Sequence, residues 1–177
     1  SNIVIPVGKD SLSMSTKWGK KYSYEVKSPL SLILSAFASI NDVDKYVTPY
    51  TNKKSQLFLV DLGRGKDRMG GSGLDQTLSY TNHKAPNINK LDDLLNYFEF
   101  TQELVRKNLL NAYHDRSDGG LITTLIEMAF VSNMSVDLKN ISKKSKSELI
   151  RFLFNEELGG IFAIDKKYEK EFIKLIR

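Results

Sequence analysis

The segment with the most chemical potential is His114-Asp115-Arg116-Ser117-Asp118-Gly119-Gly120, which lies between an apolar run and a helical pattern. A strand-to-helix junction directs backbone N–H groups and the positive end of a helix dipole toward a bound anion. The carboxylates of Asp115 and Asp118 would hold a hard divalent cation that bridges to phosphate oxygens. The segment therefore indicates a Mg²⁺-nucleotide site, and a capped helix after an ordinary turn is the alternative interpretation.

Side chains alternate between two faces of an extended chain, so Asp115 and Ser117 would share one face. A metal ligand and a hydroxyl that contacts phosphate would then converge. His114 stands where an acid–base group would act, although a histidine that is hydrogen-bonded within the core is an equally good interpretation.

A glycine-rich loop at residues 63–73 is the second candidate, with five glycines and three basic side chains. Glycine lets the backbone approach a ligand closely, and basic side chains favour an anion. The loop is not a Walker motif, because no Gly-Lys-Ser/Thr closes it into a helix. Gly70, Gly71 and Ser72 precede a predicted helix and are the phosphate-binding candidates. A mobile hairpin or crossover loop is the alternative.

Gly8-Lys9-Asp10-Ser11 follows a predicted buried strand at residues 2–7. If the strand continues, Lys9 and Ser11 share one face and Asp10 lies on the other. Lys9 beside a phosphate and Asp10 on Mg²⁺ is the functional interpretation, and a solvated strand end is the alternative.

Two acids, Glu156 and Glu157, follow Asn155 at the end of a predicted helix and precede two glycines. Acids at a helix C-terminus oppose the helix dipole. They therefore indicate an outside partner, such as a metal, an arginine or an N–H donor.

The elements that would position these residues alternate along the chain. Hydrophobic periodicity and turn residues predict strands at residues 30–40, 56–62, 109–114, 134–138 (an edge strand) and 160–165. The same signals predict helices at residues 74–80, 90–107, 120–131, 147–154 and 167–177, with Asn89 capping the second. The alternation predicts an α/β (α+β) fold with one mixed sheet flanked by helices.

The composition is that of a globular chain: 177 residues, 41% hydrophobic and 27% charged. No apolar stretch reaches the roughly 18 residues of a membrane span. The absence of cysteine excludes disulfides and thiolate metal sites and accords with the cytoplasmic location that we expect. The net charge of +5 comes from dispersed lysines, which we interpret as solvated faces rather than a nucleic-acid surface. An apolar strand at the start and an unterminated helical pattern at the end predict a piece of a longer polypeptide.

Four segments, taken in order, resemble the large single-chain form of phosphoribosylformylglycinamidine synthase: residues 5–14, 28–32, 113–121 and 154–159. Gly-Lys-Asp-Ser beside His-Asp-Arg-Ser-Asp-Gly-Gly is the most specific part of the resemblance. It implies that residues 1–18 are the tail of a sheet-forming synthetase domain. Residues 19–177 would then form an α/β domain like the C-terminal domain of aminoimidazole ribonucleotide synthetase.

The resemblance also implies an activity. Enzymes of this family convert formylglycinamide ribonucleotide, glutamine and ATP to formylglycinamidine ribonucleotide in purine biosynthesis. ATP activates the amide oxygen, and ammonia from a glutaminase domain displaces phosphate. The implied cofactors are Mg²⁺ and ATP or ADP, and the implied partners are the ribonucleotide substrate and the remaining synthetase and glutaminase domains. We expect no nucleic-acid or membrane partner and no synthase activity of this chain alone.

By the resemblance, Asp115 is a Mg²⁺ ligand, Ser117 contacts the nucleotide, and Gly8 and Lys9 line a cleft between domains. Smaller relatives have a Gly-Asn pair where Lys9 and Asp10 stand here, so the assignment of Asp10 to the metal departs from the family pattern. Two other readings remain: a thiamine-phosphate kinase-like member of the same superfamily, and a basic nucleic-acid-binding module.

Overall fold

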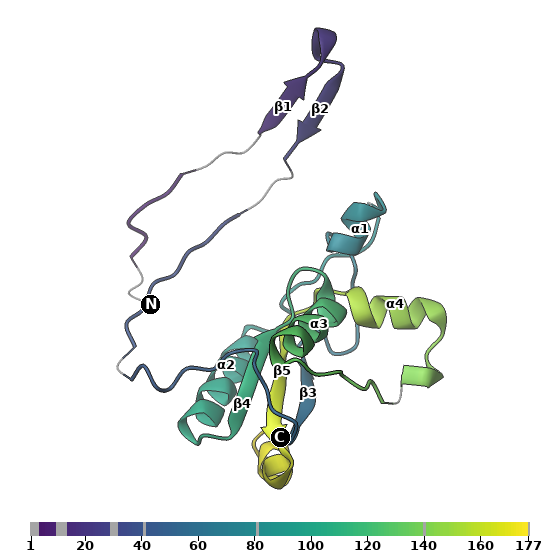
Figure 1. Ribbon diagram of the computed structural model, residues 1–177. Helices are drawn as coiled ribbons and strands as arrows, with labels where there is room; N and C mark the ends of the chain where they lie inside the picture. Colours follow the sequence, from purple (N-terminus) through teal and green to yellow (C-terminus); the bar gives the residue numbers. More distant parts are fainter. Residues whose placement is uncertain are drawn as a thin grey trace. The chain divides into compact units, whose positions relative to one another are not determined.

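The computed structural model describes residues 4–9, 14–28, 32–40, 42–80, 82–139 and 141–176. The chain divides into two compact units, Ser1–Asn41 and Asp42–Arg177, and each is described by itself (Figure 1). Among the described residues, no helix combines the length and the apolar character needed to cross a bilayer.

The first unit contains a hairpin of two antiparallel strands, β1 (Ser15–Trp18) and β2 (Tyr24–Lys27), joined through the 3₁₀ helix η1 (Lys20–Tyr22). Trp18 stacks on Tyr24 across the pair, with ring centroids 5.6 Å apart.

The predicted buried strand at residues 30–40 is wrong for its described part. Residues 32–40 have no regular structure, and Leu32, Ile33 and Leu34 are 80–86% exposed. The described residues 4–7 of the other predicted N-terminal strand are likewise irregular and exposed. A continuous apolar run forms a central strand only where other elements cover both of its faces. Among the described residues of the first unit, nothing covers these runs.

The second unit is built on a three-stranded antiparallel sheet in the order β3 (Ser55–Asp61), β5 (Gly159–Asp165), β4 (Leu110–Asp115). Its helices are α1 (Gly73–Thr77), α2 (Leu91–Arg106), α3 (Gly120–Ser132), α4 (Lys146–Phe154) and α5 (Glu169–Leu175), with 3₁₀ helices η2 (Ile141–Lys143) and η3 (Lys166–Tyr168). The predicted α/β (α+β) class, a sheet flanked by helices, is confirmed. Its strand pairings are antiparallel throughout the described residues, which is simpler than the mixed sheet expected.

Three of the predicted strands and all five predicted helices of this unit are present, whereas the edge strand at residues 134–138 is not. This segment is irregular, and Val136 and Leu138 instead pack against the core cluster below α3. The apolar residues of this segment are therefore packed against the core, although the segment does not pair with a strand.

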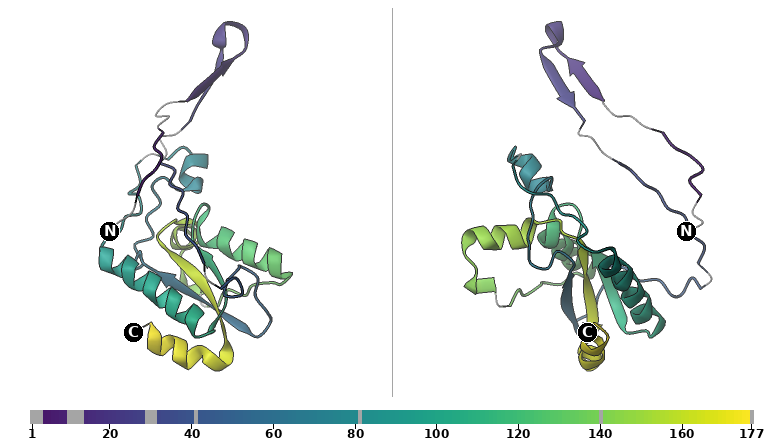
Figure 2. Two further views of the ribbon diagram at one scale, coloured as in Figure 1. Left: turned by 90° about the vertical axis from the view of Figure 1, so that its left-hand side faces the viewer. Right: turned by 180° about the vertical axis from the view of Figure 1, so that it is seen from behind.

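The central strand β5 is buried on both faces. Ile161 and Ala163 pack on one face with Leu121, Leu125 and Met128 of α3. On the other face, Phe162 and Ile164 pack with Leu104 of α2 and Phe172 of α5. Figure 2 shows α3 on one side of the sheet and α2 and α5 on the other. Since successive side chains of a strand alternate between faces, burial on both explains the continuous apolar sequence.

Two helix N-termini differ in how they are capped. Ser145 and Glu148 form a capping box at the start of α4. The predicted cap of α2 by Asn89 is wrong: the N-cap residue is Lys90, without a side-chain cap. The amide oxygen of Asn89 instead accepts a hydrogen bond from Lys66 Nζ at 2.7 Å, so an outside donor uses the group that would have capped the helix.

Two buried tyrosines make stability sensitive to alkaline pH. The hydroxyls of Tyr97 and Tyr113 are 2.9 Å apart, and burial raises the pKa of both. In the unfolded chain a tyrosine ionises near pH 10, while these two stay protonated in the folded chain. The free energy of unfolding should therefore be fully retained below about pH 10 and fall as the pH rises further. Urea titrations from neutral to alkaline pH should show a smaller fall for Tyr97→Phe; equal falls would contradict the explanation.

Candidate functional site

The junction between β4 and α3 exposes the polar side chains singled out in the sequence. Asp115 ends β4 with its side chain 62% exposed, and Ser117 and Asp118 are also exposed. The chain then turns through Gly119 (φ +83°) and Gly120 (φ +73°) into α3. A Cβ at Gly120 would lie 2.7 Å from the carbonyl oxygen of Asn155, so that both conformation and space require glycine there.

Arg116, between the two exposed residues, is buried and anchors the junction. Its Nη2 donates to Asp61 Oδ1 at 2.5 Å, and its Nε donates to the Glu157 carbonyl at 2.6 Å. These contacts tie the junction to the end of β3 and to the segment before β5. Asp115 and Ser117 are thus presented to solvent by a fixed backbone, and the exposure of both agrees with the prediction that they share one face.

Glu156 occupies the helix N-terminus that this junction forms. One of its oxygens, Oε1, accepts hydrogen bonds from Gly119 N at the start of α3 and from Gly73 N at the start of α1, both at 2.8 Å. A carboxylate at a helix N-terminus is favoured by the dipole. The sequence indicated an outside partner, such as a metal, an arginine or an N–H donor, and the partners of Glu156 are N–H donors. The same contacts mean that these two N–H groups face the chain's own carboxylate rather than a ligand.

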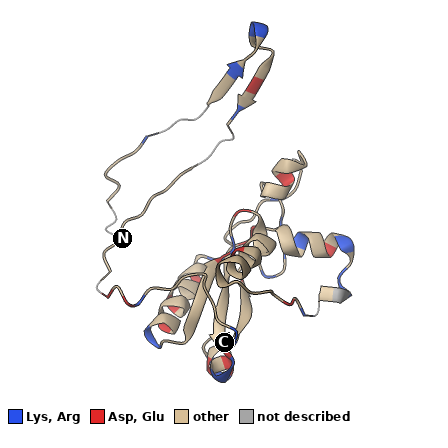
Figure 3. Cartoon of the chain, viewed as in Figure 1, with Lys and Arg blue, Asp and Glu red and all other residues tan. Residues whose placement is uncertain are grey.

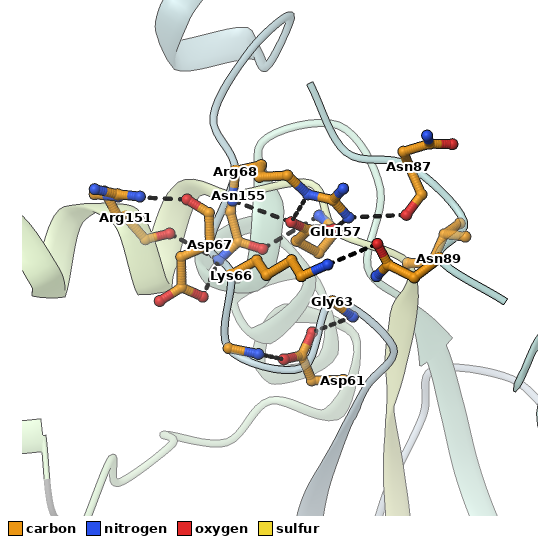
Figure 4. A network of polar contacts seen from close by, with 12 residues as sticks. Asp61, Gly63, Lys66, Asp67, Arg68, Asn87, Asn89, Arg151, Asn155 and Glu157 are labelled. Atoms are coloured by element: carbon orange, nitrogen blue, oxygen red, sulfur yellow. Dashed lines mark hydrogen bonds and ion pairs between the residues drawn. The ribbon is translucent and has the colours of Figure 1, made fainter. Parts of the chain in front are cut away.

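Glu157 has the arginine partner that its position indicated. Its carboxylate is buried and forms a two-pronged ion pair with Arg68, Nε to Oε1 at 2.6 Å and Nη2 to Oε2 at 2.7 Å (Figure 4). The backbone N–H of Arg68 donates to the same Oε1. Glu157 therefore fixes the glycine-rich loop against the segment before β5.

The glycine-rich loop at residues 63–73 is held by carboxylates from several sides. Asp61 accepts from the backbone N–H groups of Gly63 and Gly65. Asp67 Oδ1 accepts from Asn155 Nδ2 at 3.1 Å. Burial raises the pKa of Asp67, and the nearby charge of Asp61 raises it further. These contacts, shown in Figure 4, give the loop one defined conformation.

Two of the three phosphate-binding candidates have their polar groups engaged inside the chain. Gly70 N donates to the Lys84 carbonyl at 2.8 Å. Ser72 is buried and caps α1, its Oγ accepting from Asp75 N at 3.2 Å. Gly71 is exposed with φ +80°. Contact of this segment with phosphate stays a prediction beside the structural role described.

The N-terminal candidates lie in the other unit. Gly8 and Lys9 are exposed in irregular chain, and Asp10 lies outside the described residues. Their assignments to nucleotide and metal stay predictions.

A metal at the junction would be only partly enclosed by the described residues, which contain no cluster of three or more His, Cys, Asp or Glu that could hold one. His114 Nε2 is 2.6 Å from Glu127 Oε2, and its Nδ1 is 3.4 Å from Asp115 Oδ1. Mg²⁺ commonly takes one or two carboxylates and completes its shell with phosphate oxygens and water. The exposed Asp115 and Asp118 fit a metal held in that shared way.

One pair of interacting polar side chains was missed by the sequence analysis. His83 Nδ1 lies 2.9 and 2.8 Å from the two carboxylate oxygens of Asp75, whose side chain is 2% exposed. The sequence predicted a helix at residues 74–80, but the return of the chain from α1 to His83 carries no short motif.

The fold and this junction define the class of the protein. Residues 60–177 match the family described as AIR synthase related protein, C-terminal domain, and the chain belongs to this family. Residues 1–39 match the FGAR-AT PurM N-like domain. Two successive matches of this kind confirm the resemblance to the large formylglycinamidine ribonucleotide synthases. The predicted division into residues 1–18 and 19–177 stays a prediction.

A solved structure, T. maritima PurL complexed with ATP, is similar to this chain with a TM-score of 0.51 and 13% sequence identity. The match covers 75% of this chain and 21% of the other, so that the chain spans about a fifth of that protein. At this level of identity the likeness shows the fold alone.

Proposed function

We propose that this chain contributes Mg²⁺-nucleotide contacts to a phosphoribosylformylglycinamidine synthase. Such an enzyme would convert formylglycinamide ribonucleotide, glutamine and ATP to formylglycinamidine ribonucleotide in purine biosynthesis. The observation that carries the proposal is the anchored β4–α3 junction, where Asp115, Ser117 and Asp118 are exposed beside the buried Arg116. The two family matches and the likeness to an ATP complex support it.

Each residue would have a distinct role. Asp115, together with phosphate oxygens, would bind Mg²⁺, which neutralises phosphate charge. The Ser117 hydroxyl would donate to a phosphate oxygen. Gly8 and Lys9 would contact the nucleotide, and Asp10 would add a carboxylate to the metal. Arg116 and Glu156 do not touch the ligand in this proposal; they hold the junction in place.

The partners and location also belong to the proposal. The ribonucleotide substrate, the first synthetase half and the glutaminase would complete the active enzyme, which would work in the cytoplasm. We expect no turnover by this chain alone, because the active enzyme would also need the first synthetase half. With glutamine as the nitrogen source it would further need a glutaminase, whose nucleophile in the family is a cysteine, and this sequence has none. A coupled phosphate-release assay with substrate and ammonia would detect activity that contradicts this.

Calorimetric titration with ADP and ATP, with and without Mg²⁺, tests the junction. We expect binding that needs Mg²⁺ and that weakens on the order of tenfold or more, about 1.4 kcal/mol or more, in Asp115→Asn. Asp137→Asn, which removes an exposed carboxylate remote in sequence from the junction, is the matched control and should bind as the wild type does. Equal affinity of Asp115→Asn and wild type would contradict the assignment. Binding to DNA that weakens steeply with salt would favour the nucleic-acid module instead.

A further inference from the structure

A cavity of about 810 Å³ lies between the segment that contains α1, residues 66–84, and the exposed side of α4. The residues that line it do not include any of the β4–α3 junction. Small-molecule sites in proteins commonly have volumes of about 300–1,000 Å³. The cavity is therefore a second candidate site, separate from the proposed nucleotide site.

The buried carboxylate of Asp75 and the half-exposed imidazole of His83 form part of the cavity wall. Among the described residues, the Asp75 carboxylate has His83 Nδ1 as its hydrogen-bond partner, at 2.8 and 2.9 Å. A buried carboxylate must be paired with a donor, so Nδ1 carries a hydrogen. The imidazole is thereby fixed in orientation. Its Nε2 is left for a ligand, since it has no hydrogen bond or ion pair with a described residue, and the His83 side chain is 50% exposed.

Three cations of the wall lack a described carboxylate partner in an ion pair. Lys66 Nζ donates to the neutral amide of Asn89, and Arg151 Nε donates to the backbone carbonyl of Asp67 at 3.4 Å. Lys84 Nζ makes no hydrogen bond or ion pair with a described residue. Arg68, by contrast, is neutralised by Glu157. Figure 4 shows the Lys66 and Arg151 contacts, and Figure 3 shows basic residues on α4.

Acidic groups near these cations are few. Asp75 is the acidic residue among those that line the cavity, and its carboxylate is paired with His83. Asp67 lies beside Arg151, but it is not one of the residues that line the cavity, and its carboxylate accepts a hydrogen bond from Asn155 Nδ2. Glu148 of α4 is engaged with the backbone of Ser145. The wall thus has an excess of positive charge, which favours an anion.

The wall also contains apolar side chains. Leu78, at the end of α1, and Ile150 of α4 both line the cavity and are 51% and 47% exposed. Leu74 and Met69 add further apolar surface. A ligand that covers these side chains removes apolar surface from water and gains free energy in doing so.

We propose that this cavity binds a phosphate monoester with an apolar or aromatic body. Lys84 and Arg151 would hold the phosphate, and the body would pack on Leu78 and Ile150. His83 Nε2 would form one hydrogen bond to the phosphate, as acceptor from P–OH when the ring is neutral or as donor to P–O⁻ when it is protonated. The phosphate is preferred to a carboxylate because its two negative charges match more than one cation. The proposal does not depend on the proposed function.

Phenyl phosphate, without metal, is the first probe, since it has both features and cannot replace a Mg²⁺-nucleotide. The chain has two histidines, so each ring C–H signal can be assigned from one variant in a proton–carbon correlation spectrum. Titration should shift the His83 signals and leave those of His114 in place. Inorganic phosphate, which lacks the body, and benzoate, which lacks the second charge, should each bind on the order of tenfold more weakly. Shifts confined to His114, or benzoate binding as tightly, would overturn the proposal.

Variants locate the site and separate binding from folding. Lys84→Met and His83→Asn should each weaken phenyl phosphate on the order of tenfold. The asparagine amide can still donate to Asp75 while Nε2 is lost, and equal unfolding curves would show that the fold is kept. Lys170→Met removes an exposed lysine of α5 and should bind as the wild type does. Asp115→Asn should also leave phenyl phosphate binding unchanged, which distinguishes this site from the junction. An unchanged affinity in Lys84→Met would refute the proposal.

Discussion

Replacing Phe162 by alanine is expected to lower the free energy of unfolding by about 3–5 kcal/mol, the range found for large aromatic side chains removed from cores. Phe162 lies in the middle strand of the sheet and is 0% exposed. Its ring contacts four other aromatic rings at centroid distances of 5.0–6.2 Å, those of Tyr97, Phe100, Tyr113 and Phe172. The cavity left by the phenyl group would be shared by α2, α5 and β4, so no single neighbour can fill it.

Urea unfolding followed by circular dichroism measures this loss. Phe130→Ala is the matched control, because Phe130 lies on α3 with 84% of its surface exposed. Its removal should change stability by no more than about 0.5 kcal/mol. Similar losses for the two variants would mean that Phe162 does not occupy the centre of a packed core.

Glu157→Ala is expected to destabilise the chain by about 3–5 kcal/mol, because it leaves a largely buried arginine without its counter-charge. The Arg68 side chain is 14% exposed and the Glu157 side chain 2%. The carboxylate also accepts the Arg68 backbone N–H, so the glycine-rich loop loses a backbone contact as well. Removing one partner of a buried ion pair lowers the free energy of unfolding by more than the intact pair contributes to it, because the remaining charge stays buried without a partner.

The double replacement Glu157→Met with Arg68→Met tests that reason. Exchange of a whole buried ion pair for apolar side chains is often close to neutral, so the double variant should be more stable than Glu157→Ala. Glu103→Ala, which removes an exposed partner of Arg106 and Lys107, serves as a surface control and should have little effect. If Glu157→Ala unfolds at the same urea concentration as the wild type, the ion pair does not hold the loop.

The sequence predicted well those elements whose own periodicity reflects their burial. Helix α2 has apolar residues at three- and four-residue spacing, and β5 is continuously apolar because it lies between two helical layers. The prediction of a buried strand at residues 30–40 was wrong because hydrophobicity shows that a segment would gain from burial but does not show which element would bury it. Strand directions failed for a similar reason: pairing depends on the whole path of the chain.

The candidate site could be predicted where neighbouring residues in the sequence interact unfavourably and therefore need a partner from elsewhere in the chain. Acids after a helix oppose its dipole, and the partners that this required are Gly73 N, Gly119 N and Arg68. The buried role of Arg116 could have been inferred from alternation around Asp115 and Ser117. The Asp75–His83 pair could not, because it depends on how the chain returns after α1.

Glu156 Oε1, which accepts hydrogen bonds from two helix N-termini, couples the positions of those two helices. Because one atom accepts from the first turns of both α1 and α3, a displacement of either helix start lengthens a bond that also positions the other. Hydrogen bonds weaken steeply once distance and angle leave a narrow range. The glycine-rich loop and the β4–α3 junction are therefore constrained to shift together, and a ligand seated beside one of them changes the energy of moving the other.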